Sequence, residues 1–195
     1  MKHGVRHRRL DVIDYMILYT VYSLREDLTS RAISNILAYA VMIKSRRFDP
    51  LIEYARHFKI SMVSWVMVDD LWARLYSLAK WGLIVLLRGI SKFLVVRAPP
   101  RPRIDPRQYL PAEVEFRLNE AIEVYRSKGL QGLIKDFSDI TGLTVTLMHG
   151  PFHGKTLDKY IEVFRRLSSI KSPCPECPST DEFLEMRRQI KDFPT

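Results

Sequence analysis

Cysteine is scarce in this sequence, with two residues among 195. A small secreted domain held together by disulfide bonds needs many more, so that class is excluded. Long apolar runs are also lacking. No uncharged stretch approaches the roughly 18 residues that span a bilayer, and the basic first segment has no apolar core of the kind found in signal peptides. We therefore expect a cytoplasmic protein without a membrane partner.

Asparagine and glutamine are rare, with two and three residues, whereas arginine outnumbers lysine by 20 to 11. Few thermolabile amides among many ionisable side chains are typical of hyperthermophile proteins, in which intracellular disulfides also occur.

Catalytic motifs are lacking as well. No Ser or Cys stands in a recognisable nucleophile motif, and adjacent carboxylates such as Asp69 and Asp70 diverge by about 100° on a helix. We therefore expect a protein that is not an enzyme.

Positive charge is in excess, and the excess lies in one half of the chain. The net charge is +9. Residues 1–110 hold 19 Lys and Arg against 9 Asp and Glu, a balance of +10, whereas residues 111–195 hold 12 against 13, a balance of −1. A basic segment joined to a neutral one indicates that the first half binds a polyanion such as nucleic acid.

Hydrophobic periodicity predicts a mainly α-helical protein of the α+β class. Residues 11–24 are apolar on nearly every face of a helix, which is typical of a buried helix. Three more helices are expected in the first half, each opened by a capping residue: from Thr29 or Ser30, from the Asp-Pro pair at 49–50 to about residue 59, and from Ser61 or Ser64 to Lys80.

The end of the last of these helices carries the informative motif. Residues 75–84 read Leu-Tyr-Ser-Leu-Ala-Lys-Trp-Gly-Leu-Ile, where Gly82 predicts a left-handed stop, and residues 83–87 and 92–97 predict a β-hairpin. This order of helices, followed by Gly-Leu-Ile and a hairpin, resembles a winged helix-turn-helix domain at the level of the superfamily. The resemblance covers residues 10–98, about half the chain, and implies an N-terminal winged helix with a β-hairpin wing.

The resemblance also implies how double-stranded DNA is bound. The helix ending at Lys80 would lie in the major groove, the hairpin tip at Arg88 would touch an adjacent groove or phosphates, and basic arms would enter a minor groove. The expected contacts are all cations: Arg74, Lys80, Arg88, Lys92 and Arg97 on helix and hairpin, Arg101, Arg103 and Arg107 in a linker, and Arg6, Arg8 and Arg9 at the start of the chain. The function implied is transcriptional regulation or another DNA-templated process.

Two rival functions stay open. Early in the expected recognition helix stand Trp65, Met67, Asp69 and Asp70, where carboxylates would repel phosphates and the apolar side chains suit a protein surface. The domain would then be a docking subunit of a transcription or replication assembly, with its first helix as a contact surface and its positive charge as a solvated face. Alternatively, the basic face and exposed aromatic side chains bind single-stranded nucleic acid.

A domain boundary is expected at residues 99–111, which hold five Pro and three Arg and predict a stiff, extended linker. Residues 1–98 would form the winged helix. Residues 112–195 would form a small α-rich domain for homodimerisation or contact with a protein partner. Its expected elements are a helix up to Gly129, a short helix at 131–139, a strand at 143–148, a helix at 155–169 and a charged helix near 181–191.

One metal site is expected in this C-terminal region. His149 and His153 are followed, after twenty residues, by the pair Cys174 and Cys177 in a Cys-Pro-Glu-Cys motif. Two His and two Cys can supply the tetrahedral ligand set that Zn²⁺ takes in structural sites. Zinc is thus the expected cofactor, and a disulfide or two inert thiols are the alternatives.

Residues 150–156, Gly-Pro-Phe-His-Gly-Lys-Thr, are similar to a phosphate-binding loop. They are one residue short of the full spacing, and His149 stands where the first glycine belongs. Too few residues follow for a nucleotide hydrolase core, so this segment indicates at most an anion site at the start of a helix.

Overall fold

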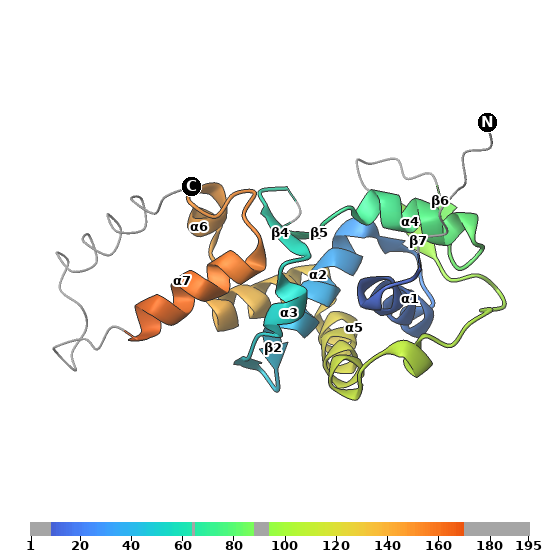
Figure 1. The fold of residues 1–195 in the computed structure, drawn as a ribbon, viewed down its shortest axis with the longest axis horizontal. Coiled ribbons are helices and arrows are strands. Elements are labelled where there is room, and N and C mark those ends of the chain that lie inside the picture. Colours follow the sequence, from blue (N-terminus) through green and yellow to red (C-terminus); the bar gives the residue numbers. More distant parts are fainter. Residues whose placement is uncertain (1–8, 64, 88–93, 170–195) are drawn as a thin grey trace.

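The computed structural model describes residues 9–63, 65–87 and 94–169, which form a mixed α and β fold (Figure 1). The α+β composition expected from the sequence is confirmed. The elements in chain order are α1 (Val12–Leu24), β1 (Leu28–Thr29), α2 (Ser30–Met42), β2 (Ile43–Lys44), β3 (Arg47–Phe48), α3 (Ile52–Ala55), β4 (Phe58–Ser61), β5 (Trp65–Val68), α4 (Leu71–Lys80), β6 (Val85–Leu87), β7 (Val95–Arg97), η1 (Pro106–Tyr109), α5 (Ala112–Thr141), α6 (Val145–His149) and α7 (Leu157–Ser169).

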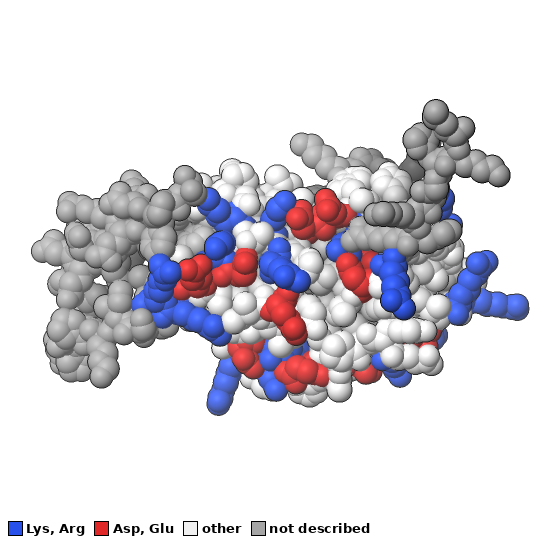
Figure 2. Space-filling view, in the orientation of Figure 1, with Lys and Arg blue, Asp and Glu red and all other residues white. Residues whose placement is uncertain are grey.

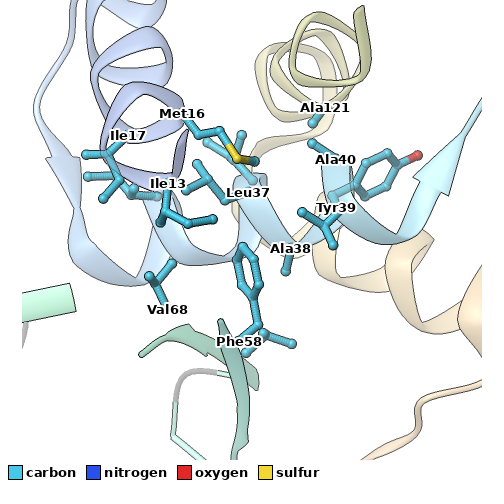
Figure 3. Close-up of a cluster of buried hydrophobic side chains, with 14 of the residues drawn as sticks. Ile13, Met16, Ile17, Leu37, Ala38, Tyr39, Ala40, Phe58, Val68 and Ala121 are labelled. Atoms are coloured by element: carbon cyan, nitrogen blue, oxygen red, sulfur yellow. The ribbon is translucent and has the colours of Figure 1, made fainter. Parts of the chain in front are cut away.

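Helix α2 lies at the centre of the molecule (Figure 1). Its start is fixed by Thr29, whose hydroxyl oxygen accepts a hydrogen bond from the Ala32 N–H at 3.1 Å, as expected of a capping residue. Every residue of α2 except Arg31 is buried. Figure 3 shows why: α1 packs on one side through Ile13 and Met16, α5 on another, and β4 and β5 cover a third. Each large apolar side chain buried here contributes about 1.5–3 kcal/mol.

The β-hairpin expected after residue 82 is confirmed, and it belongs to a three-stranded antiparallel sheet in the order β1-β7-β6. Gly82 has a φ of 69°, and this left-handed residue ends α4. The Leu83 N–H donates to the Leu78 carbonyl and the Gly82 N–H to the Ala79 carbonyl, the hydrogen-bond pair of a Schellman motif. The turn directs the buried side chains of Leu83 and Ile84 into the core ahead of β6.

Two helices expected between residues 49 and 80 are wrong in extent. The helix expected to reach residue 59 ends at Ala55, and the one expected from Ser61 or Ser64 begins only at Leu71. Between them, β4 and β5 pair as antiparallel strands, with Phe58 opposite Val68. Side chains alternate between buried and outward positions along both strands. This period of two prevails because every second residue belongs to the hydrophobic core, where β5 packs against α2.

The C-terminal helices are placed largely as expected, with one error. Gly129 breaks α5 into two helical parts at a non-helical φ of 66°, which confirms the expected break, and α7 is also confirmed. The strand expected at 143–148 is wrong, because Val145–His149 forms the short helix α6. The Thr144 carbonyl accepts from the Met148 N–H, and this turn buries Met148. Among the described residues, no helix combines the length and apolar character needed to cross a bilayer.

The segment expected as an extended linker is folded onto α1. Pro106 and Leu110 are buried, η1 forms between them, and the Tyr109 ring stacks on the Tyr15 ring with centroids 4.6 Å apart. The hydrophobic core is continuous across this segment, because α5 packs directly on α2. Residues 99–111 therefore do not separate two cores within the part of the chain that the structure describes.

Candidate nucleic-acid interface

Helix α4 has one buried face and one exposed face. Leu71, Leu75 and Leu78 are buried, whereas Trp72 and Tyr76 are 41% and 56% exposed. Lys80 follows on the same side and is also exposed, because residues four apart share one face of a helix. We call Trp72, Tyr76 and Lys80 the α4 stripe. Its two aromatic rings and single ammonium group lie immediately before the turn into the β6–β7 hairpin.

Arg74 does not belong to that exposed face, and its expected role as a DNA contact is wrong. Its side chain is only 6% exposed, and the guanidinium Nη1 lies 2.8 Å from Asp11 Oδ1 and 2.7 Å from Asp14 Oδ1. Burial disfavours the charged form, but the hydrogen bonds to Asp11 and Asp14 outweigh it and raise the pKa of Arg74. The positive charge of Arg74 is therefore paired with the two carboxylates of Asp11 and Asp14, and this ion pair joins α4 to α1.

Arg97 is exposed but paired. Its guanidinium makes two hydrogen bonds to the Asp27 carboxylate, at 2.5 and 2.7 Å, which link the end of β7 to the segment before β1. The hydrogen bonds from Arg97 lower the pKa of Asp27, so this carboxylate remains charged at neutral pH. Arg97 is thus neutralised locally, and a phosphate would have to compete with Asp27 for it.

The remaining cations that were expected at the interface fall into two groups. Within the described residues, Lys80, Arg9 and Arg101 are exposed and form no ion pair, and Arg103 lies beside the turn at Gly82. Arg107 is also exposed and lies 3.6 Å from Glu115. Arg6, Arg8, Arg88 and Lys92 lie outside the described residues. On the side of the molecule drawn in Figure 2, basic and acidic side chains are interspersed.

Carboxylates border the start of α4. Asp69 forms an ion pair with Lys59, with Nζ 2.8 Å from Oδ1, and Asp70 is exposed with a left-handed φ of 54°. Trp65 and Met67, which the sequence placed on a recognition helix with these two residues, belong instead to β5. The expected helix is thereby shortened to ten residues. The end of α4 that could meet DNA is the C-terminal end, where Lys80 and the hairpin lie.

The expected zinc ligands are only partly within the described residues. His149 ends α6 and His153 lies in the following turn, and both are exposed. Cys174 and Cys177 lie outside the described residues. Within the described part of the chain, no group of three or more His, Cys, Asp or Glu side chains is placed to hold a metal ion. Zinc at these four residues stays a prediction.

The backbone N–H groups of residues 152–155 are already hydrogen-bonded within the protein. The Gly154 N–H donates to the Ile60 carbonyl at 3.0 Å, and the Lys155 carbonyl accepts from the Ile60 N–H at 2.8 Å. This loop is therefore paired with the edge of β4. A phosphate-binding loop needs its N–H groups directed at the ligand, so the resemblance to one is not matched by the structure.

The structure also assembles a cleft that the sequence did not indicate. It lies between the end of α1, residues 102–107 and α5, and four arginines line it: Arg25, Arg103, Arg107 and Arg126. Tyr19 and Tyr22 line the same cleft. These residues come from three segments with no common spacing, so no local pattern could have found them. The only signal in the sequence was the general excess of arginine.

Comparison with models of known protein families, with curated proteins and with solved structures gives no match for this chain.

Proposed function

We propose that this protein binds double-stranded DNA through the α4 stripe and the adjacent β6–β7 hairpin, as a winged helix does. The observation that carries the proposal is the arrangement around α4: an amphipathic surface helix whose exposed stripe ends in Lys80, followed at once by a hairpin that is paired with β1. The balance of +10 over residues 1–110 supplies the attraction to phosphates that drives DNA association.

The connection between α2 and α4 is longer than in a helix-turn-helix. In that motif a turn of three or four residues joins the two helices, whereas here residues 43–70 separate α2 from α4 and contain β2 to β5. The orientation of α4 is set instead by Arg74 and the Asp11–Asp14 pair on α1. Contact with DNA would therefore depend on α4 and the hairpin, with α2 remaining in the core.

The test is a fluorescence-anisotropy titration of the full chain against a mixed-sequence duplex and a single strand at two salt concentrations. The proposal expects duplex preference and an affinity that falls steeply as salt rises. Lys80→Glu is expected to weaken duplex binding and to reduce the salt slope by about 1. The matched control is Lys155→Glu, an exposed lysine beside β4 that should leave binding unchanged.

Absence of salt-dependent binding to the duplex would overturn the proposal. Equal effects of Lys80→Glu and Lys155→Glu would also contradict the assignment to α4, because the attraction would then be a general property of the charge. A preference for the single strand, together with quenching of tryptophan fluorescence, would replace duplex binding by stacking of bases on the α4 stripe.

A second candidate function is favoured by the exposure of Trp72 and Tyr76. Large aromatic side chains are enriched at the energetically dominant positions of protein interfaces, and Val85 of β6 adds a third exposed apolar side chain. A second copy of this chain is the partner that can be tested directly. Sedimentation equilibrium should then show a dimer that Trp72→Ser with Tyr76→Ser dissociates, whereas monomers at all concentrations would contradict dimerisation through this surface.

A further inference from the structure

The arginine-lined cleft has the size of a small-molecule site. Its volume is about 680 Å³, and pockets that hold small ligands usually enclose about 300–1,000 Å³. One wall is the end of α1 with Tyr19, Tyr22 and Arg25, the second is formed by residues 102–107, and the third is α5 with Asn119 and Arg126.

Two of the four arginines in this cleft are compensated and held in place. Arg126 pairs with Glu123 at 2.6 Å and also donates to the Ser23 carbonyl at 2.9 Å. Arg107 lies 3.6 Å from Glu115, and its guanidinium group lies over the Tyr19 ring, 5.8 Å from the centroid. These contacts fix the walls of the cleft without requiring a ligand.

The other two arginines are not compensated. Arg25 and Arg103 are exposed, and neither has an ion pair within the described residues. The acidic residue that lines the cleft, Asp105, accepts a hydrogen bond from the Arg107 N–H with its carboxylate and so caps η1. This hydrogen bond to a neutral group does not cancel the charge of Asp105, but the four arginines still outnumber the carboxylates of Asp105, Glu115 and Glu123. Arg25 and Arg103 are the two that form no ion pair within the described residues.

Uncharged groups in the cleft add a polar donor and an apolar surface. The Tyr19 hydroxyl donates to Asn119 Oδ1 at 2.7 Å, which commits the amide oxygen and leaves the NH₂ group of Asn119 as the available donor. The Tyr22 hydroxyl is directed away into a hydrogen bond with the Leu83 carbonyl at 2.7 Å. The half-buried Tyr22 ring supplies the apolar surface of the cleft, whereas the Tyr19 ring is buried beneath Arg107.

We propose that this cleft binds a small phosphate-bearing molecule, with the phosphate between Arg25 and Arg103 and the remainder of the ligand against the Tyr22 ring. A phosphate monoester carries a charge of about −1.5 to −2 at neutral pH, so it is attracted to the two guanidinium groups that form no ion pair. Guanidinium also binds phosphate oxygens in a bidentate manner, so two arginines give orientation as well as attraction.

The cleft also reaches the turn that ends α4. The Arg103 guanidinium lies 3.7 Å from the position that a Cβ on Gly82 would occupy, and Tyr22 holds the Leu83 carbonyl. A ligand that orders Arg103 would therefore stabilise the turn between the α4 stripe and the hairpin. An effect of the ligand on DNA binding would require that the protein binds DNA, as proposed above. Binding of the ligand in the cleft does not require it.

The experiment uses the full chain in isothermal titration calorimetry with four probes: inorganic phosphate, pyrophosphate, adenosine monophosphate and adenosine. The proposal expects binding of the phosphate-bearing probes, adenosine monophosphate above all, and none of adenosine. Arg25→Gln and Arg103→Gln should each weaken binding at least about tenfold, because each removes a charge-assisted contact to the phosphate. Neither side chain is buried, so the melting temperature without ligand should be unchanged.

The matched control is Arg101→Gln, which removes an exposed arginine of the same segment that does not line the cleft and should bind as the unchanged protein does. The proposal is overturned if no probe binds at millimolar concentration, or if all three variants bind alike. It is also overturned if only duplex DNA binding responds to Arg25→Gln and Arg103→Gln, since the cleft would then hold a backbone phosphate. Duplex binding without any probe binding refutes the cleft alone, and probe binding without duplex binding refutes the DNA proposal alone.

Discussion

Arg74 of α4 and Asp14 of α1 form a buried ion pair, with Nη1 2.7 Å from Oδ1 and both side chains about 95% buried. Asp14 also belongs to the capping box of α1, in which its carboxylate accepts from the Asp11 N–H and the Asp11 carboxylate accepts from the Asp14 N–H. The same two carboxylates thus begin α1 and hold α4. The direction in which the α4 stripe faces is therefore fixed from the start of α1.

Arg74→Met is expected to destabilise the protein by about 3–5 kcal/mol, because it leaves the Asp14 carboxylate buried without its partner. Urea unfolding at neutral pH measures the change. Arg101→Met, at an exposed position, should stay within about 0.5 kcal/mol of the unchanged protein. If Arg74→Met changed the free energy of unfolding as little as Arg101→Met does, the Arg74–Asp14 ion pair would not be the contact that fixes α4 on α1.

Gly129 is expected to be intolerant of any side chain. Its φ of 66° and ψ of −176° lie in a region populated almost only by glycine, although an added Cβ would meet no atom within 4 Å. Gly129→Ala should therefore cost about 1–3 kcal/mol of conformational strain. The comparison is Gly142→Asn, since Gly142 has the ordinary left-handed φ of 70° and ψ of 4° that asparagine tolerates. A lower melting temperature for Gly142→Asn than for Gly129→Ala would contradict the strain expected at Gly129.

Tyr160 joins the end of α5 to α7. Its hydroxyl donates to the buried Thr141 carbonyl, its ring packs edge-on against Phe152, and burial raises the pKa of the hydroxyl. Tyr160→Phe should destabilise the protein by about 1–3 kcal/mol, because the carbonyl loses its donor. Tyr76→Phe, with a ring 56% exposed, is the control and should be nearly neutral. Equal stability of the two variants, measured in urea, would show that Thr141 finds another donor.

His57 is expected to make stability depend on pH on the acidic side. Burial lowers its pKa, and the charges of Arg56 and Arg74 lower it further against the opposing effect of Asp11 and Asp69. The unfolded chain therefore takes up a proton near the ordinary value of 6.5 while folded His57 resists it, so stability is lost as the pH falls through 6.5.

The measurement for His57 is urea unfolding at pH 7.5 and 5.5. His57→Gln should lose less stability between these two conditions than the unchanged protein does. His149→Gln, at an exposed histidine, should show the full loss. An unchanged dependence in His57→Gln would assign the acid sensitivity to other groups.

The zinc prediction has a direct measurement. Protein purified without chelators is expected to contain zinc by elemental analysis, and Cys174→Ser with Cys177→Ser should remove it. Chelation by EDTA should lower the melting temperature of the unchanged chain and not that of the double variant. Metal content near zero, with the same melting curve in EDTA, would leave the two cysteines as a disulfide or as free thiols.

Local chemistry determined the elements that the sequence predicted correctly. Thr29 caps α2 through its own hydroxyl, Gly82 ends α4 because it adopts a positive φ, and Gly129 breaks α5 for the same reason. Such positions are readable because the residue type and the backbone conformation are linked within a few residues. The apolar character of residues 11–24 likewise predicted a buried helix, and α1 is enclosed by α2, η1 and α5.

Only the tertiary structure decided the rest, because it depends on pairings between distant residues. The sequence predicted helix at residues 58–61 and 65–68, but these segments form strands because they pair with each other, and Lys59 also pairs with Thr156. The sequence predicted Arg74 to be an exposed cation, but in the fold it contacts Asp14, which lies 60 residues earlier in the chain. The arginine cleft arises the same way, since folding alone brings Arg25, Arg103 and Arg126 from three segments to one place.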